Sequence, residues 1–498
     1  MEVEDWRLKL EGWRLKLEIS YFSLHTLYFT LGQFLLLLTT LLHPNPSLQK
    51  PWKYAQLGLL IFPLLPSIGA FGLLLAIALT WRRQYNKIIR RRWNWVLAIL
   101  SGWLILTSWF AFRPVDAFLG LFNFLPFFCI FASLSALIQT PAQLRRLAQI
   151  LVVTSVPVVI IGLGQMYLGW ATPAAWKDIL LGLGCAIAPG GNPLGRMSSV
   201  FMYANHLAGY SAIVFILSLG LWLEADQESP AQRRRSAHKE NLIQNLKSKI
   251  QNPLAPRLFL TAAVIGNFVA LLLTNSRNAW AIAAIAAIAF AVYQRWYWLV
   301  ALVLAVTLLV ILAAFAPAPI GLPLRQIVPG YFWQRLTDQL YPNRPSVSLR
   351  STQWQFAWEL TIQRPLTGWG LRNFQPLYQL QMHAWFGHPH NLFLMLSAET
   401  GIPATLIFCG WVILIFWQGI KLLLRWSQTI KNHQPLFNQE KLIFFSYQLA
   451  LFACILFNTV DVTIFDLRLN TLVWVVLSAV AGVVYHQHDA ACDQRQKS

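Results

Sequence analysis

The chain has 498 residues, of which 56% are apolar and only 12% are charged, and its formal net charge is +20. A soluble domain carries about 25% charged residues, so this composition excludes an ordinary soluble protein. Long apolar blocks recur along the chain, each able to cross about 30 Å of hydrocarbon. No nucleic-acid-binding signature appears, so we attribute the basic charge to membrane connectors and predict no nucleic-acid partner.

The first segment, residues 1–20, contains the hexapeptide Trp-Arg-Leu-Lys-Leu-Glu twice. In a helix, Trp6, Leu10, Trp13 and Leu17 would form one apolar stripe, with arginine–glutamate pairs four residues apart beside it. This pattern is typical of a cytoplasmic helix lying in the membrane interface, and a solvated tail is the alternative. The segment lacks the pattern of a cleavable signal peptide.

Residues 21–486 contain about a dozen apolar runs, which predict an all-α polytopic membrane domain. Lysines and arginines concentrate in connectors such as 82–92 and 421–441, and the positive-inside rule assigns these to the cytoplasm. Both termini, including the tail 487–498, are then cytoplasmic. The predicted spans are 21–42, 55–80, 95–112, 117–138, 149–169, 199–223, 258–275, 279–294, 297–317, 402–420, 442–460 and 469–486.

Two longer polar stretches interrupt this pattern. Residues 224–257 include three consecutive arginines and are predicted to form a cytoplasmic insertion. Residues 318–401 fall on the outer side, and they contain six arginines but no lysine. Because Gln353–Gln363 has helical spacing, we predict that 318–401 fold as an external subdomain before the tenth span.

Two other features carry no functional prediction. The stretch from Gly190 to Arg196 resembles a phosphate-binding loop, but it lacks the required Lys and Ser/Thr and is interpreted as a flexible external turn. The cysteines have neither metal nor redox spacing, so we interpret them as packing residues. They are Cys129, Cys185, Cys409, Cys454 and Cys492.

Unusual polar residues gather in the connectors assigned to the outer side. Ionisable groups at membrane depth are costly, so they tend to mark a site. Arg277 can also extend to the lipid headgroups, and Asp461, Asp466 and Arg468 can form an ordinary loop ion pair. The set comprises Asn205, His206, Arg277, His383, His388, His390, Asp461, Asp466 and Arg468.

The chemistry that these residues favour is group transfer involving an anionic lipid headgroup. Guanidinium groups bind phosphate bidentately, and a histidine accepts a proton from a hydroxyl near neutral pH. Arginines would then stabilise a pyrophosphate leaving group without a metal. A zinc site at His388 and His390 is an alternative, but no cysteine or carboxylate cluster stands beside them, so we predict no metal and no other cofactor.

The stretch His390-Asn391, nine further residues and Gly401-Ile402-Pro403-Ala404 resembles the O-antigen ligase signature. Ala404 stands where that signature has Gly, Thr or Tyr, a position that calls only for a small residue. Three further features are similar to the wider superfamily of O-antigen ligases, polymerases and protein–glycan ligases. They are Thr274-Asn-Ser-Arg277, the Arg350 that opens a Trp-bearing helix, and Arg364-Pro-Leu-Thr-Gly-Trp-Gly370.

This resemblance implies a GT-C-like, metal-independent, inverting glycosyltransferase in the bacterial inner membrane. Such an enzyme takes a glycan from undecaprenyl pyrophosphate at the periplasmic face, and ligases transfer it to lipid A-core in lipopolysaccharide biosynthesis. It implies His390 as the base or acceptor-positioning group, and Arg277 and Arg350 as ligands of the donor pyrophosphate. Asn205 is similar to a family asparagine. The other accessory candidates, chosen by proximity and chemistry, are Arg372, His388, Asn391, Asp461 and Arg468.

Two alternatives stay open at this point. The first is a polymerase or protein–glycan ligase of the same superfamily, because a short motif does not encode the acceptor. The second is an inorganic-carbon transporter, a function proposed for cyanobacterial relatives. A carrier would place polar residues near the bilayer midplane, often on broken helices in paired repeats. Here the polar residues gather at one face and the sequence has no evident inverted repeat.

Overall fold

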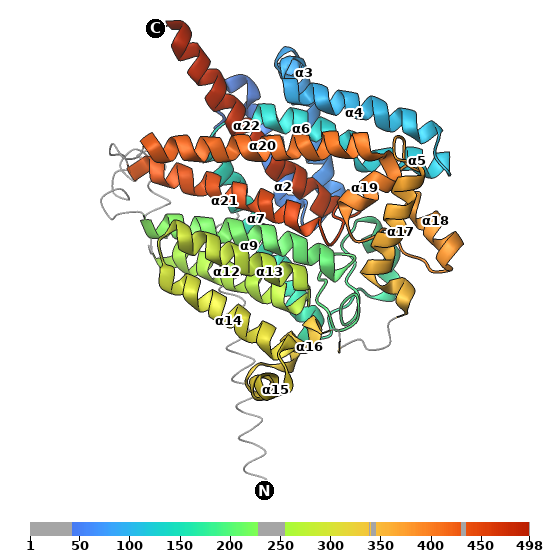
Figure 1. The fold of residues 1–498 in the computed structure, drawn as a ribbon. Coiled ribbons are helices and arrows are strands. Elements are labelled where there is room, and N and C mark those ends of the chain that lie inside the picture. The colour runs from blue at the N-terminus through green and yellow to red at the C-terminus, as the bar shows by residue number, and fades with distance from the viewer. Residues whose placement is uncertain (1–41, 228–253, 338, 340–344, 430–434, 498) are drawn as a thin grey trace. The chain divides into compact units, whose positions relative to one another are not determined.

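The computed structural model describes residues 42–227, 254–337, 339, 345–429 and 435–497. Contacts divide the chain into two units, Met1–Pro46 and Ser47–Ser498, and all elements discussed below belong to the second. Its described residues form helices and no strand, which confirms the all-α prediction (Figure 1). The predicted helix over 1–20, the first span except its last residue, and most of the insertion 224–257 lie outside the described residues.

Seven of the described helical segments are long and apolar enough to cross a membrane, and two shorter apolar helices accompany them. These nine coincide with the predicted runs from 117–138 onward, whereas the total of about twelve spans stays a prediction. The seven are Pro114–Leu137, Pro141–Tyr167, Ala204–Ala225, Tyr297–Phe315, Ile402–Gln428, Gln439–Phe457 and Leu467–Asp489, and the shorter two are Arg257–Leu273 and Arg277–Tyr293.

The predicted span 55–80 is wrong as a single helix. The chain instead forms α2 (Gln49–Ile61) and α3 (Pro66–Arg90), because the connecting turn contains prolines that cannot continue a helix. The two helices pack closely, and a Cβ on Gly72 would lie only 2.9 Å from the Gly58 Cα. This segment is therefore a hairpin of two helices whose backbones pack closely at glycines. It is followed by α4 (Arg92–Trp109), which corresponds to the predicted run 95–112.

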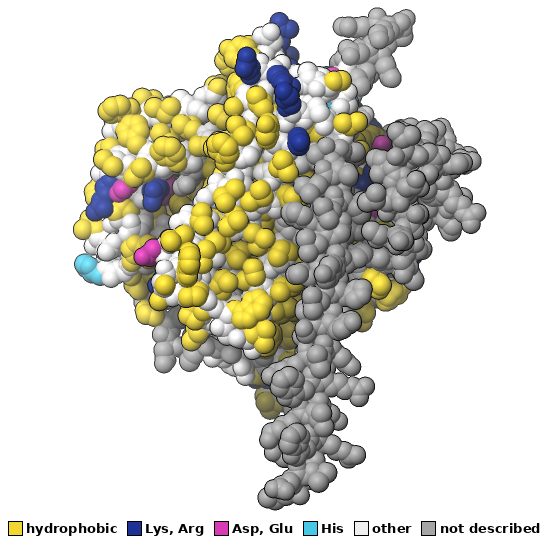
Figure 2. All heavy atoms as spheres, turned by 180° about the vertical axis from the view of Figure 1, so that it is seen from behind, with side chains coloured by type: hydrophobic (Ala, Val, Ile, Leu, Met, Phe, Trp, Pro, Cys, Tyr) yellow, Lys and Arg dark blue, Asp and Glu magenta, His cyan; other side chains and the backbone are white. Residues whose placement is uncertain are grey.

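Helix α9 (Ala204–Gln227) lies at the centre of the bundle. In its apolar window and in that of α22, 83% of the residues are buried, against 11% for α14 (Tyr297–Phe315). The inner helices thus carry the core, and α14 exposes an apolar surface of the kind that covers much of the face in Figure 2. The helices around α9 are α7 (Pro141–Tyr167), α12 (Leu254–Leu273), α13 (Arg277–Tyr293), α21 (Pro435–Phe457) and α22 (Leu467–Lys497).

Polar side chains define one end of this bundle. Helix α7 begins with a capping box, in which Thr140 and Gln143 each satisfy a backbone N–H of the other. Beside it, Arg145 Nε donates to both carboxylate oxygens of Glu224, at 2.8 and 2.9 Å. This pair ties the start of α7 to the last turns of α9, so the start of α9 lies at the opposite end of the bundle.

The described residues of 318–401 form short helices, and those from 350 to 400 share a small core of their own. This core contains Phe356, Leu360, Phe374, Tyr378 and Ala398. The predicted helix over 353–363 is confirmed as part of α17. The elements are α15 (Ala318–Ile327), α16 (Gly330–Leu336), η4 (Ser346–Ser348), α17 (Arg350–Gln363), α18 (Phe374–Met382) and α19 (Leu392–Thr400), followed by α20 (Ile402–Thr429).

Gly401 lets α19 turn directly into α20. Its φ is +84°, a conformation that side chains rarely adopt, and a Cβ there would clash with the Leu366 carbonyl oxygen. The next residue, Ile402, donates its N–H to the Pro365 carbonyl at 2.8 Å. The glycine of the signature thus keeps this loop against the end of α19, and the buried Ala404 agrees with the expected need for a small residue.

Candidate functional site

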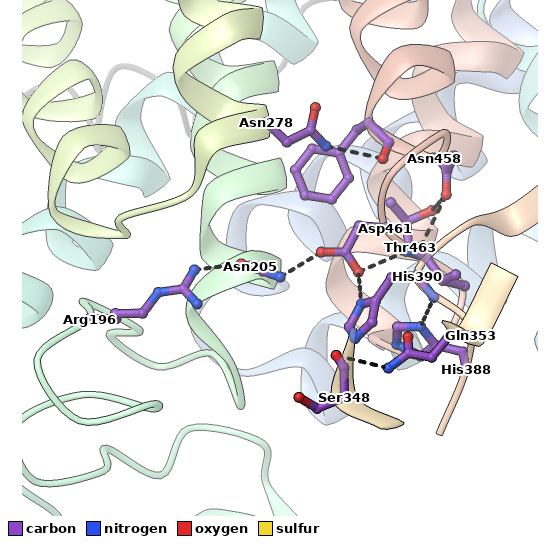
Figure 3. Close-up of polar contacts among 12 residues, drawn as sticks. Arg196, Asn205, Asn278, Ser348, Gln353, His388, His390, Asn458, Asp461 and Thr463 are labelled. Atoms are coloured by element: carbon purple, nitrogen blue, oxygen red, sulfur yellow. Dashed lines mark hydrogen bonds and ion pairs between the residues drawn. The ribbon is translucent and has the colours of Figure 1, made fainter. Parts of the chain in front are cut away.

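A tight turn before α19 presents the signature histidine. His390 has a φ of +50°, and its backbone N–H donates to His388 Nδ1 at 3.2 Å. The next residue, Asn391, caps α19 by accepting the Leu394 N–H at 3.0 Å. The accessory candidate Asn391 therefore acts on the helix, and the turn directs the His390 ring toward the segment between α21 and α22 (Figure 3).

His390 pairs with the buried carboxylate of Asp461. Its Nδ1 lies 3.2 Å from Asp461 Oδ1, which also accepts the Val462 N–H at 2.9 Å. Burial favours the neutral acid, but the hydrogen bond and charge of His390, with Arg350 nearby, hold the pKa of Asp461 below its usual range. Because an ionised carboxylate only accepts, His390 Nδ1 carries the proton, and its Nε2 has a lone pair in the neutral ring.

A line of side chains extends from this pair into the bundle. Asn205 Nδ2 donates to Asp461 Oδ2 at 2.6 Å, and Asn205 Oδ1 accepts from Arg196 Nη2 at 2.6 Å. Figure 3 shows the order Arg196, Asn205, Asp461, His390. The structure thus brings together three predicted residues and adds Arg196, which the sequence analysis assigned to a flexible turn. Its only sequence signal was an arginine directly after a glycine-rich turn.

Asparagines that the sequence analysis did not identify hold the segment carrying Asp461. Asn278, in the first turn of α13, donates to the Phe457 carbonyl at 3.1 Å. Asn458 Oδ1 accepts from both the N–H and the hydroxyl of Thr463, each at 3.1 Å. The Asn458 carbonyl accepts the Leu392 N–H at 2.9 Å. The segment is thereby tied to α13 and α19, and no local sequence pattern distinguishes these amides.

The two predicted donor-binding arginines each open a helix. Arg350 is the first residue of α17, and its charge acts on both Asp461 and His388. Arg277 is the first residue of α13, next to Asn278, and its Nη1 lies 3.4 Å from the Leu336 carbonyl oxygen. A helix N-terminus carries partial positive charge, so both arginines lie where an anion is favoured.

The other two predicted arginines make their contacts elsewhere in the fold. Arg468 is buried, and its guanidinium donates to the carbonyls of Pro63 at 2.9 Å and of Gly184. It therefore joins the start of α22 to the turn after α2, which is a structural role. Arg372 has an exposed side chain, and both its backbone N–H and its charge act on the buried Glu399.

His388 lies behind His390 as a neutral ring. It stacks on Phe465 with centroids 5.4 Å apart, and burial together with the charge on His390 lowers the pKa of His388 to about 3. Ligand atoms of His388, His390 and Asp461 lie within 4.8 Å of one another, a spacing compatible with a metal ion. However, His388 Nδ1 already accepts a backbone N–H, so its Nε2 carries the proton. This arrangement favours hydrogen bonding over metal ligation.

A second histidine–carboxylate pair lies beside the first. His206 Nδ1 lies 3.3 Å from Asp466 Oδ2, and Asp466 Oδ1 caps α22 by accepting the Leu469 N–H at 2.8 Å. Burial favours the neutral acid, but the contact with His206 holds the pKa of Asp466 below its usual range. This pair anchors the start of α22 to the first turn of α9.

Comparison with known families matches part of the chain. The O-antigen ligase family model matches residues 262–409, which include Arg277, Arg350 and His390. The match confirms the resemblance predicted from the motifs, and the seven apolar helices support an integral membrane protein. No match was found among curated proteins. Asn205 and Asp461 lie outside the matched stretch.

Proposed function

We propose that this protein is a glycosyltransferase that moves a glycan from a lipid pyrophosphate to an acceptor hydroxyl. The observation that carries the proposal is the pair formed by His390 and Asp461, at 3.2 Å. His390 belongs to the ligase-like signature, and its Nε2 has the lone pair that a general base needs. Asp461 orients the ring and stabilises the imidazolium that forms, as the aspartate does in hydrolase triads.

In the proposed step, the acceptor oxygen attacks the anomeric carbon of the donor sugar while His390 Nε2 takes its proton. The bond from the anomeric carbon to the pyrophosphate oxygen breaks with inversion, and undecaprenyl pyrophosphate leaves with the bonding electrons. Arg277 and Arg350 would bind that pyrophosphate and stabilise its developing charge.

Helix ends support an anionic substrate at this place. The starts of α9, α19 and α22 meet at the pairs of His390 and Asp461 and of His206 and Asp466, and α13 is tied there through Asn278. Each of these helices adds partial positive charge at its N-terminus. Together with the arginines, these ends stabilise negative charge without a metal ion.

The proposal also has a direction across the membrane. It assigns the site and the subdomain 318–401 to the periplasm, and the termini and insertion 224–257 to the cytoplasm. The acceptor would be lipid A-core or a similar glycolipid, and the catalytic domain, 21–486, would be GT-C-like. The strongly basic connectors on the inner side support this assignment.

A deletion strain tests the function. Its lipopolysaccharide and extracellular polysaccharide are compared on gels after complementation with wild type or with His390→Ala. Loss of long glycan from lipid A-core, with accumulation of undecaprenyl-linked glycan rescued only by wild type, supports a ligase. Accumulation of lipid-linked single units supports a polymerase. Unchanged glycans with reduced bicarbonate uptake would refute transfer and support the transporter.

Purified protein tests the assigned residues. We expect His390→Ala and Arg277→Ala each to abolish transfer while the protein stays folded and inserted. Full activity of either variant at normal expression would refute the site. A chelator should leave transfer intact, and a strict metal requirement would instead favour ligation by His388 and His390.

A further inference from the structure

Arg196 is a buried arginine at the end of the turn before α9. The turn closes tightly on it, because Gly191 has a φ of +92° and a Cβ there would clash with the Arg196 carbonyl. The Gly195 N–H donates to the Gly190 carbonyl at 2.9 Å and completes the turn. The glycine-rich stretch is therefore a rigid support that directs one guanidinium into the bundle.

The guanidinium of Arg196 joins two parts of the site. Its Nη2 donates to Asn205 Oδ1 at 2.6 Å, and its Nε donates to the Thr274 carbonyl at 2.8 Å. The following Met197 N–H donates to the Leu273 carbonyl at 2.9 Å. Leu273 ends α12, and Thr274 begins the turn before Arg277. One side chain thus contacts both the line to His390 and the turn that positions a donor-binding arginine.

The order of donors and acceptors along this line of side chains determines the orientation of the Asn205 amide. A guanidinium only donates hydrogen bonds, and an ionised carboxylate only accepts them. The amide between Arg196 and Asp461 must therefore turn its oxygen to the arginine and its nitrogen to the carboxylate. Without Arg196, the amide is free to reverse and present its oxygen to Asp461, which would remove one of the donors that keep this carboxylate ionised.

We propose that Arg196 is a positioning residue that couples the base His390 to the donor-binding turn before Arg277. Its role in catalysis rests on the proposed glycan transfer, whereas its effect on His390 does not. Arg196 would touch neither donor nor acceptor, and would act through Asn205 and Thr274.

Several charged groups act around His390, so the direction of the effect must include all of them. Asp461 and Asp466 precede α22, His206 belongs to α9, His388 precedes α19, and Arg350 opens α17. Replacing Arg196 by Gln removes a cation from this set and releases the Asn205 amide. The lost cation no longer repels an imidazolium, and an ionised Asp461 that has lost a competing donor binds the imidazolium more strongly, so the titration midpoint of His390 should move to higher pH.

The test is an NMR titration of the ¹⁵N-labelled histidines in the full-length protein in nanodiscs, with the His390 signals assigned from His390→Ala. We expect Arg196→Gln to raise the His390 midpoint by about half a pH unit or more, and Arg196→Lys to raise it less. In an Asn205→Ala background, Arg196→Gln should add only the smaller shift that the lost charge itself causes. The control is Arg325→Gln, because Arg325 likewise donates to a backbone carbonyl, that of Ala313 at 2.8 Å, outside the site.

Transfer rates provide the second measurement. Arg196→Gln should lower kcat about tenfold and move the acid limb of the kcat/KM profile in the same direction as the NMR midpoint. A purely structural role would reduce the amount of folded protein and leave both midpoints unchanged. If Arg196→Gln does not fold, the His390 midpoints of Arg196→Lys and Asn205→Ala are compared with that of wild type instead.

Three results would overturn the proposal. They are an unchanged His390 midpoint in Arg196→Gln, an equal shift in Arg325→Gln, and a full additional shift when Asn205 is absent. If the midpoint shifts but wild-type protein transfers no glycan, the coupling stands and the proposed function fails. The two failures are therefore distinguishable.

Discussion

Asp461 accepts hydrogen bonds from three donors, and these bonds determine the tautomer and orientation of the neighbouring His390 ring. The donors are the Val462 N–H, Asn205 Nδ2 and His390 Nδ1. With two of them fixed by backbone and amide, the carboxylate stays ionised and orients the ring of His390. The chemistry at Nε2 therefore depends on a residue 71 positions away in the chain.

The variant Asp461→Asn tests this dependence. It removes the charge that stabilises the imidazolium and permits the wrong tautomer of His390, so we expect kcat to fall about 10²–10⁴-fold. The measurement is the initial rate of glycan transfer by purified protein. Asp178→Asn, at an exposed position of α8 (Lys177–Gly182), is the matched control. A rate for Asp461→Asn within twofold of wild type would contradict the assignment.

Glu399 makes a prediction about pH and stability. Burial raises its pKa to about 7, although the backbone N–H groups of Phe374 and Arg372 favour the ionised form. In the unfolded chain this carboxyl ionises near pH 4.5, whereas in the folded protein it stays neutral until about pH 7, so rising pH in this range stabilises the unfolded chain. The contribution of Glu399 to the free energy of unfolding should therefore fall between pH 4.5 and 7, by about 3 kcal/mol.

Glu399→Gln removes this titration and keeps an oxygen for the Phe374 N–H. Thermal unfolding should show the variant more stable than wild type at pH 8 and nearly equal at pH 5. Glu359→Gln, on the exposed face of α17, should leave the pH dependence of wild type unchanged. Equal stability of Glu399→Gln and wild type at both pH values would refute the raised pKa.

Short elements around the site depend on close backbone contacts. The loop before α18 follows the end of α19 through Trp369 N–H to Ala398 and Gly370 N–H to Glu399, at 2.9 and 2.8 Å. The turn at Gly401 completes this packing. Because His390 and Asn391 begin the same short helix, a displacement at its end would be transmitted to the base.

Two glycines, Gly401 just before α20 and Gly410 within it, distinguish backbone strain from a lack of space for a side chain. Gly401→Ala would place a side chain at a φ of +84° and against the Leu366 carbonyl, so it should lower the free energy of unfolding by about 2 kcal/mol or more. Gly410→Ala meets nothing within 4 Å and should change stability by no more than about 1 kcal/mol, in the stabilising direction. Thermal unfolding of both variants checks this, and equal effects would contradict the strained turn.

Across the whole helical unit, the site lies at one end of the inner helices. The line to His390 begins at the first turn of α9, and the Arg145–Glu224 pair lies near its last turns. In Figure 1, α20 begins beside α19 and extends to the opposite end of the bundle, where the basic connector 421–441 begins. The proposed orientation therefore places the site and the strongly basic connector on opposite sides of the membrane.

Cysteine labelling in intact cells tests that orientation. All five native cysteines are replaced by alanine, and Gln381→Cys or Asn86→Cys is added, both at exposed positions. A membrane-impermeant maleimide should label Gln381→Cys directly and Asn86→Cys only after permeabilisation. The reverse pattern would place the site in the cytoplasm and contradict a periplasmic donor.

Much of the helical architecture is predictable from local hydropathy. The nine apolar runs from 117–138 onward each coincide with a helix, because a run of about 20 apolar residues satisfies its backbone only as a helix in lipid. The hairpin in 55–80 was missed because hydropathy does not register prolines and close-packed glycines. The signature also singled out His390, which lies in a polar cluster with Asp461, and its role stays a prediction.

The partners of His390 required the tertiary structure. Asn205 and Asp461 lie 256 positions apart, and Arg196 reaches Thr274 across 78 positions. Such contacts depend on which helix ends meet when the bundle packs, whereas the sequence pattern records only neighbours along one helix. The sequence by itself therefore determined the class of fold and singled out His390 as the proposed base. Packing alone decided which carboxylate orients that histidine and which arginine holds the amide between them.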